Sequence, residues 1–137
     1  MSLFHIFDIA GSGMSAQTTR LNTVSSNMAN ANNISAKAED IYRAKNPVFA
    51  SVMKEVSGES ALSSVKVVNI QESAQEGTRR YEPNNPLADE EGFVYQSNVN
   101  TMEEMANMIS ASRSYQNNVE IMNTAKQLML ATLKLGQ

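Results

Sequence analysis

Three consecutive acidic residues, Asp89, Glu90 and Glu91, form the densest cluster of side chains that could bind a metal ion. Carboxylate oxygens suit Ca²⁺, but this spacing lacks the alternating ligands of an EF-hand loop, so a solvated turn is the better interpretation. The chain has one histidine and no cysteine, which excludes a histidine cluster, a thiolate site and a disulfide. The sequence therefore predicts no metal site.

The other residues that could carry chemistry are equally isolated. His5 lies among apolar residues with no nucleophile motif elsewhere, so we interpret it as a packing or interface residue. Gly11 and Gly13 lack the third glycine, the preceding strand and the downstream lysine of a phosphate loop. Arg79 and Arg80 are a lone basic pair on a chain of net charge −3, which argues against a nucleic-acid partner. We expect no enzyme activity, no cofactor and no small-molecule substrate.

The elements that organise the chain are two stretches with helical spacing. The longer one, residues 100–135, begins with a capping signal, Asn100 or Thr101 followed by Glu103 or Glu104. A helix of this length would run about 50 Å, more than a domain of this size needs to cross its core. We therefore expect part of its apolar seam to face other subunits. Steps of three and four residues place on this seam Met105, Met108, Ser112, Tyr115, Val119, Met122, Lys126, Met129 and Leu133.

A second seam starts almost at the N-terminus, and its helix is expected to stop near Ala31 because several asparagines follow. The segment from Gly11 to Gly13 has two compatible interpretations, a helix break or a site where a neighbouring helix approaches closely. Nine residues form this seam: Leu3, Phe7, Ala10, Met14, Gln17, Leu21, Val24, Met28 and Ala31.

Lys126 is the discordant member of the C-terminal seam. Its charged end can reach solvent along an apolar surface, or it can fix the register of assembly by pairing with a carboxylate of a neighbouring subunit. The sequence leaves both open.

The middle of the chain has the residue pattern of β-strands instead of helices. Alternating apolar residues predict short strands at 48–53, 65–70 and 93–95, with a turn at 57–60 and loops at 35–40 and 72–78. The chain is 42% hydrophobic and only 6% aromatic, so we expect a thin core and a compact β-rich insert.

The predicted fold is therefore mainly α with a small β-rich insert. We divide the chain into an N-terminal helical segment (1–32), a middle region of short strands and loops (33–99) and a long C-terminal helix (100–137). The two terminal helices are expected to pair as a discontinuous coiled coil.

Several stretches resemble bacterial flagellar basal-body rod proteins. Residues 2–33 are similar to the opening of that family, whose motif reads Leu-Asn-x-x-x-x-Asn-x-Ala-Asn. Residues 42–49, 81–100 and 104–137 follow in family order and are most similar to its proximal rod members. The motif falls on Leu21, Asn22, Asn27, Ala29 and Asn30.

The resemblance implies a structural subunit of the flagellar drive shaft, with terminal helices packed as concentric tubes. It implies contact with copies of itself, with other flagellar rod proteins, and with the inner-membrane ring and export-gate side of the basal body. It also implies a periplasmic location after type III export without a cleaved signal peptide, which fits a first segment without a basic region and the lack of an apolar run of about 20 residues. The alternative is a coiled-coil adaptor or another secretion-apparatus subunit that shares only the helix pattern.

Overall fold

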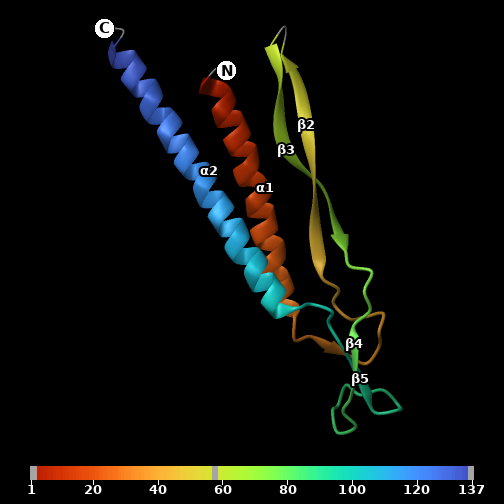
Figure 1. The fold of residues 1–137 in the computed structure, drawn as a ribbon. Helices are drawn as coiled ribbons and strands as arrows, with labels where there is room; N and C mark the ends of the chain where they lie inside the picture. Colours follow the sequence, from red (N-terminus) through yellow and green to blue (C-terminus); the bar gives the residue numbers. More distant parts are fainter. Residues whose placement is uncertain (1–2, 57–58, 136–137) are drawn as a thin grey trace.

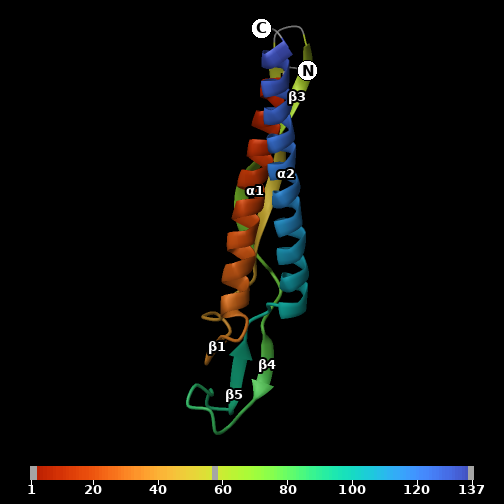
Figure 2. The same cartoon turned by 90° about the vertical axis from the view of Figure 1, so that its left-hand side faces the viewer.

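Two long helices form the main body of the protein. The computed structural model describes residues 3–56 and 59–135. Helix α1 (Leu3–Asn30) and helix α2 (Thr101–Leu135) run side by side in opposite directions (Figures 1 and 2). The strands are β1 (Ile34–Ser35), β2 (Lys45–Val56), β3 (Glu59–Glu72), β4 (Thr78–Tyr81) and β5 (Phe93–Gln96).

Helix α1 lies between α2 and a long antiparallel hairpin formed by β2 and β3 (Figure 1). The hairpin pairs Lys45 with Glu72 at its base, and its register shifts between Val48 and Phe49. The amide of Val65 donates to the Ser12 hydroxyl at 3.2 Å, which ties the hairpin to α1. Among the described elements, α2 packs against α1 only.

A second, smaller sheet with the order β1-β5-β4 lies beyond the lower end of the helices (Figure 1). Gly77 leads into β4, where a Cβ would lie 2.2 Å from the carbonyl oxygen of Gln96, so only glycine fits. Gly92 has a φ of +80° in the turn before β5, a conformation that favours glycine. These two glycines allow the chain to turn tightly around β5.

The predicted α2 start is confirmed at Asn100. Its side-chain oxygen accepts hydrogen bonds from the amides of Met102 at 3.1 Å and Glu103 at 3.4 Å, as an N-cap does. The helix ends at Leu135, and Gly136 lies outside the described residues.

Helix α1 runs without interruption through Gly11 and Gly13, so of the two interpretations the helix break is wrong. A Cβ on Gly13 would lie 3.0 Å from the side-chain nitrogen of Asn118 on α2, whereas one on Gly11 would have no neighbour within 4 Å. Gly13 therefore permits the close approach of the two helices, and cooperative packing along α1 outweighs the low helix propensity of two glycines.

The mainly α class with a β insert is confirmed, but the insert differs from the prediction in two ways. It forms two separate sheets instead of one compact unit, because the hairpin extends along α1. The strands predicted at 48–53 and 65–70 extend to 12 and 14 residues, and β1 and β4 were not predicted. Of the turn predicted at 57–60, residues 57–58 lie outside the described part and β3 already begins at Glu59. The coiled-coil pairing and the three-part division stay predictions.

Candidate assembly interface

The contact between the two helices is lined by small and polar residues. On α2, Glu104, Ala111 and Ala125 are buried and Asn118 is half-buried, and these four lie seven residues apart. Residues at this spacing share one face of a helix, so they form the line that packs on α1. Short side chains let the helix axes come close together.

The seam predicted for α2 overlaps this line only in part. Its members at 108, 122 and 129 are half-buried beside the line, as are Ser112 and Val119. Met105, Tyr115 and Leu133 are 46%, 37% and 64% exposed, and Lys126 is exposed as well. The most buried positions lie one residue before the predicted set 105, 112, 119 and 126. As contacts between subunits, the predicted seam residues stay a prediction.

The seam predicted for α1 agrees better with the buried residues than the seam predicted for α2 does. Its members Ala10, Val24 and Ala31 are buried. Ala16 and Thr23 are buried too, so α1 covers a second face, in keeping with its place between α2 and the hairpin. The side chain of Leu3 lies outside the described residues, and the half-buried members of the seam are Phe7, Met14, Gln17, Leu21 and Met28.

Asn27 of α1 joins three parts of the chain and is only 1% exposed. Its side-chain nitrogen donates to the carbonyl of Lys45 at 2.9 Å and to Oε1 of Glu104 at 3.1 Å. Its oxygen accepts from the Tyr42 hydroxyl and from the Lys45 amide, both at 2.9 Å. The carboxamide therefore uses its full donor and acceptor capacity to hold α1, the start of β2 and the first turn of α2 together.

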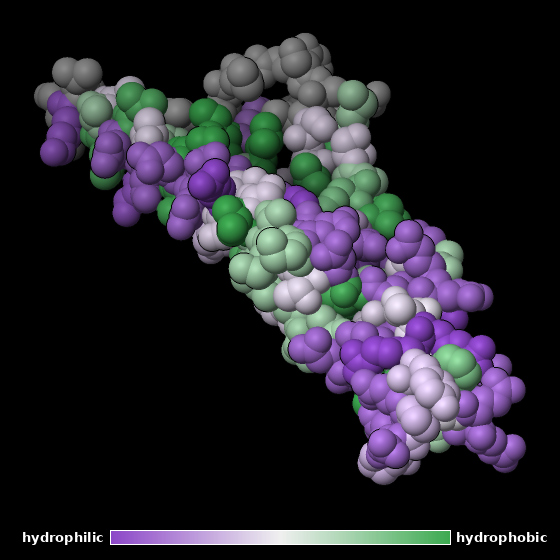
Figure 3. Space-filling view, turned by 60° about the horizontal axis from the view of Figure 1, so that its bottom comes forward, coloured by the Kyte–Doolittle hydropathy of each residue, from purple (hydrophilic) through white to green (hydrophobic). Residues whose placement is uncertain are grey.

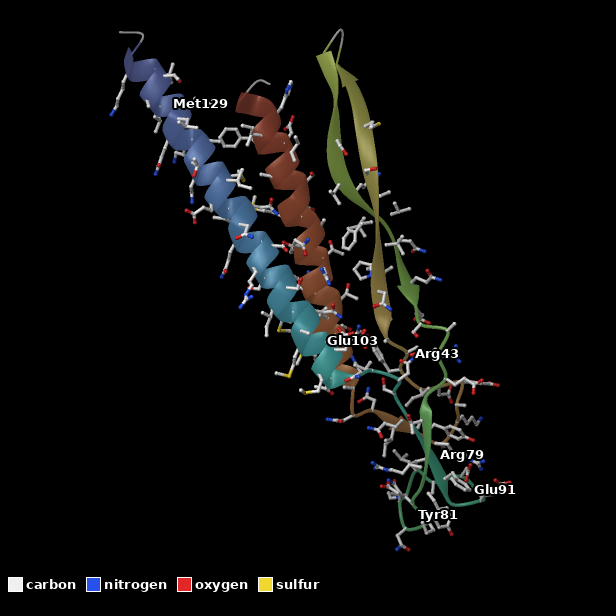
Figure 4. The ribbon with its side chains drawn as sticks, viewed as in Figure 1. Arg43, Arg79, Tyr81, Glu91, Glu103 and Met129 are labelled. Carbon is white, nitrogen blue, oxygen red and sulfur yellow. The ribbon has the colours of Figure 1, made fainter. Side chains whose placement is uncertain are left out.

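Glu104 is the charged member of this junction. It is 6% exposed, and its second carboxylate oxygen, Oε2, is buried with no hydrogen-bond partner among the described residues. Burial raises the pKa of Glu104 above its ordinary value, and nearby Glu103 adds to the rise, while the bond from Asn27 and the charge of Arg20 oppose it. Figure 4 marks this corner by the label on Glu103, where α2 begins.

Helix α2 carries several large apolar side chains that the described residues leave exposed. Ile109 and Leu130 are 53% and 50% exposed. On the more extensively packed α1, Ile9 is the one large hydrophobic residue in this class among the described residues. Figure 3 shows hydrophobic residues along the long body of the molecule and mainly hydrophilic ones at the small-sheet end. The exposed apolar residues of α2 are Met102, Met105, Ile109, Tyr115, Ile121, Leu128, Leu130 and Leu133.

Comparison with known proteins places these elements in a family. Residues 7–33 match a family model described as flagella basal body rod protein, and residues 90–135 match the C-terminal model of the flagellar basal body rod FlgEFG proteins. Flagellar basal-body rod protein FlgC is 48% identical in Escherichia coli O6:H1, 47% in Salmonella typhimurium and 50% in Yersinia enterocolitica, with 100% of both chains covered. The chain belongs to the FlgC family of basal-body rod proteins. It is a structural subunit of the flagellar rod.

The two segments matched by the rod models contain the two partners of the buried side-chain bond, Asn27 and Glu104. Of the remaining motif residues of this FlgC-family chain, Leu21 is half-buried and Asn22 and Ala29 are exposed. Asn30 donates to the Ser26 carbonyl at 2.7 Å at the end of α1. The motif thus carries one residue with an evident role in holding the fold.

Sequence reasoning found Asn27 through the family resemblance and Glu104 as a possible capping residue, but not their contact. Periodicity along one helix cannot show which residue of another element a polar side chain will reach. It also missed Tyr42 and Ala111, since an aromatic residue in a loop and an alanine among larger apolar residues give no local signal.

The isolated chemical candidates of this rod protein take part in local structure. Asp89 accepts from the amides of Glu91 at 3.0 Å and Phe93 at 2.8 Å, so it shapes the turn before β5. Arg79 pairs with Glu91 at 2.7 Å (Figure 4) and stacks on Phe93. Arg80 pairs with Glu82.

No helix within the described ranges is both long and apolar enough to cross a membrane.

Proposed function

We propose that the exposed face of α2 packs against helices of neighbouring subunits in the rod, and that many such contacts together carry motor torque along it. The observation that carries this proposal is the exposure of eight large apolar side chains on α2 in the single chain. Large apolar side chains left exposed along one element are typical of protein–protein contact sites. A hollow of about 230 Å³ lined by Ile6, Ile121 and Leu128 offers one place where a neighbour's side chain fits.

The neighbours in this proposal are copies of the same chain and other flagellar rod proteins, with the inner-membrane ring and the export-gate side of the basal body at one end. The chain reaches this place in the periplasm by type III export without a cleaved signal peptide. Membership of a basal-body rod family supports this assignment.

A substitution on the apolar face tests the proposal. Ile109→Lys places a charge on this face at a position already 53% exposed, so the isolated chain should fold normally. Burying an unpaired ammonium group against a neighbour is strongly unfavourable, so incorporation into detergent-extracted basal bodies should fall at least about tenfold and swimming should be lost. Quantitative immunoblotting of the extracted basal bodies measures this.

The matched control is Gln127→Lys, which adds the same charge to α2 at an exposed position. Gln127 shares its face with Arg113, Glu120 and Lys134, a polar stripe at seven-residue spacing. This variant should assemble at the wild-type level. Equal incorporation of the two variants would show that the apolar face of α2 makes no contact in the rod.

A further inference from the structure

Methionine is concentrated at the start of α2. The chain has nine methionines, and Met102, Met105 and Met108 lie close together in the first turns of this helix. Met102 is 76% exposed and Met105 is 46% exposed, while Met108 is half-buried. Figure 4 shows yellow sulfur atoms gathered beside the first turns of α2, on the side away from α1. Two thioethers are therefore open to small reagents at this end of the helix.

The thioether is the side-chain group of this chain that peroxide oxidises most readily, because the chain has no cysteine. The product, methionine sulfoxide, is a polar and chiral side chain in place of a flexible apolar one. Exposure favours the reaction. On α2, Met102 and Met105 are therefore the methionines where this change should occur first.

Both exposed methionines lie on the apolar surface that is proposed to meet neighbouring subunits. Met102, Met105 and Ile109 follow one another at steps of three and four residues, so they are neighbours on one face of α2. A sulfoxide on this face would be buried against a neighbour. Burying a polar group without a hydrogen bond is unfavourable, and methionine sulfoxide is known to disrupt contacts built from methionine.

Oxidation at these two positions would leave the fold of the single chain intact, because other groups hold the first turn of α2. The amides of Met102 and Glu103 donate to the side chain of Asn100, and Glu104 accepts from Asn27. Neither sulfur takes part in these bonds. The effect of oxidation would therefore fall on assembly instead of folding.

We propose that Met102 and Met105 form an oxidation-sensitive site, at which peroxide converts the chain into a form that the rod excludes. Hydrogen peroxide transfers one oxygen atom to each sulfur: the O–O bond breaks, an S=O bond forms, the sulfur loses two electrons, and water leaves. The inference deepens the proposed function, because it rests on contact between the exposed face of α2 and a neighbouring subunit.

Peroxide treatment of the isolated chain tests the reactivity of the site. Peptide mass spectrometry should find sulfoxide at Met102 and Met105 at least about threefold sooner than at half-buried Met14 and Met28. Met53 of β2 is 73% exposed and should react about as fast as Met102. If Met102 and Met105 reacted no faster than the half-buried methionines, the proposal would be overturned.

Glutamine is polar and similar in length to methionine sulfoxide, so it serves as a permanent mimic. Met102→Gln/Met105→Gln should unfold at the same urea concentration as the wild type, since both positions are exposed. Its incorporation into detergent-extracted basal bodies should fall at least about tenfold. The matched control is Met53→Gln, a change at an equally exposed position of the hairpin, which should be incorporated at the wild-type level. Equal incorporation of the two variants would overturn the proposal.

Cells exposed to hydrogen peroxide connect the oxidation to assembly. The readout is isotope-labelled chain that enters basal bodies after treatment, and each strain is compared with its own untreated culture. This ratio should fall at least about fivefold further for the wild type and Met53→Leu than for Met102→Leu/Met105→Leu, because leucine has no sulfur to oxidise. An equal fall in all three strains would mean that peroxide acts elsewhere, and the proposal would be overturned.

The outcomes separate this inference from the proposed function. If Ile109→Lys is excluded from basal bodies while Met102→Gln/Met105→Gln enters normally, the inference fails and the proposed function stands. If Ile109→Lys enters as well as Gln127→Lys does, the proposed function fails and the inference fails with it.

Discussion

The two helices differ in how much of their surface the chain covers. Helix α1 packs against α2 on one side and the β2–β3 hairpin on another, and Ile9 is its one exposed large apolar residue among the described ones. Among the described elements, helix α2 packs against α1 only, and it leaves eight such residues exposed. Within one chain, α1 is therefore covered on two sides, while α2 has one covered face and leaves large apolar residues exposed.

The two faces of α2 also differ in side-chain size. Toward α1 it places alanines, an asparagine and Glu104, whereas its exposed large apolar residues are mainly methionine, isoleucine and leucine. Small residues allow a close contact of fixed geometry, whereas long flexible side chains such as methionine adapt to varied surfaces. This division suits a helix that must pack in one way within the chain and against different neighbours outside it.

Among the substitutions inside the fold, Asn27→Leu should cause the largest loss of stability. It removes four hydrogen bonds at a position that is 1% exposed and leaves Glu104, Tyr42 and the backbone of Lys45 unpaired. We expect a loss of about 3 kcal/mol or more in the free energy of unfolding, measured by urea denaturation.

The control for this change is Asn22→Leu, an exposed asparagine of the same helix and the same family motif. Its effect on the free energy of unfolding should stay within about 0.5 kcal/mol. If Asn27→Leu lowered the free energy of unfolding by less than about 1 kcal/mol, the junction around Asn27 would add little to the stability of the fold. Helix α1 would then not be the centre of the fold.

Gly13→Leu tests the closeness of the helix contact. Its Cβ would already lie 3.0 Å from Asn118, so a larger side chain must separate α1 from α2. We expect a loss of about 1–3 kcal/mol, as for other overpacked sites, measured by thermal unfolding. Gly11→Ala is the control, because it has space for a Cβ and should gain up to about 1 kcal/mol from helix propensity. Equal effects at the two positions would indicate a looser contact than the structure has.

Glu104→Gln should reveal the buried charge through its pH dependence. Because burial raises the pKa of Glu104 in the folded chain, the unfolded chain ionises first as the pH increases above about 4.5. The wild type therefore loses stability relative to the variant from about pH 4.5 upward, until the pH passes the raised folded pKa. Urea unfolding of both proteins at several pH values measures this difference, and a difference that does not change with pH would mean that the carboxylate is solvated.

Local patterns predicted the helices well because capping and heptad spacing are properties of neighbouring residues. Asn100 caps α2, and α1 ends at Asn30, within one residue of the expected stop. The exact buried line of α2 was missed because hydrophobicity selects the large residues, while Ala111 and Ala125 are buried because Gly13 and other small residues bring the helices close. Hydrophobicity along one helix also could not separate residues that pack within the chain from residues left exposed on its surface.

The hairpin and the Asn27 junction depend on contacts between residues far apart in the chain. Strands β2 and β3 extend beyond their apolar cores because each pairs with the other along its length, including Lys45 with Glu72. The short β4 has no buried residue and forms only by pairing with β5. A pattern within one segment contains no information about such partners.

Ile109→Ser should have the smallest effect on the free energy of unfolding, and it tests the exposed apolar surface of α2. Ile109 is 53% exposed, and isoleucine and serine have similar helix propensities, so the free energy of unfolding should change by no more than about 0.5 kcal/mol. Urea unfolding at several protein concentrations measures it and separates folding from self-association. A loss above about 1.5 kcal/mol that is independent of concentration would show that the face is covered within the single chain. A small effect on folding together with loss of the serine variant from basal bodies would instead mean that the apolar face of α2 is kept for assembly.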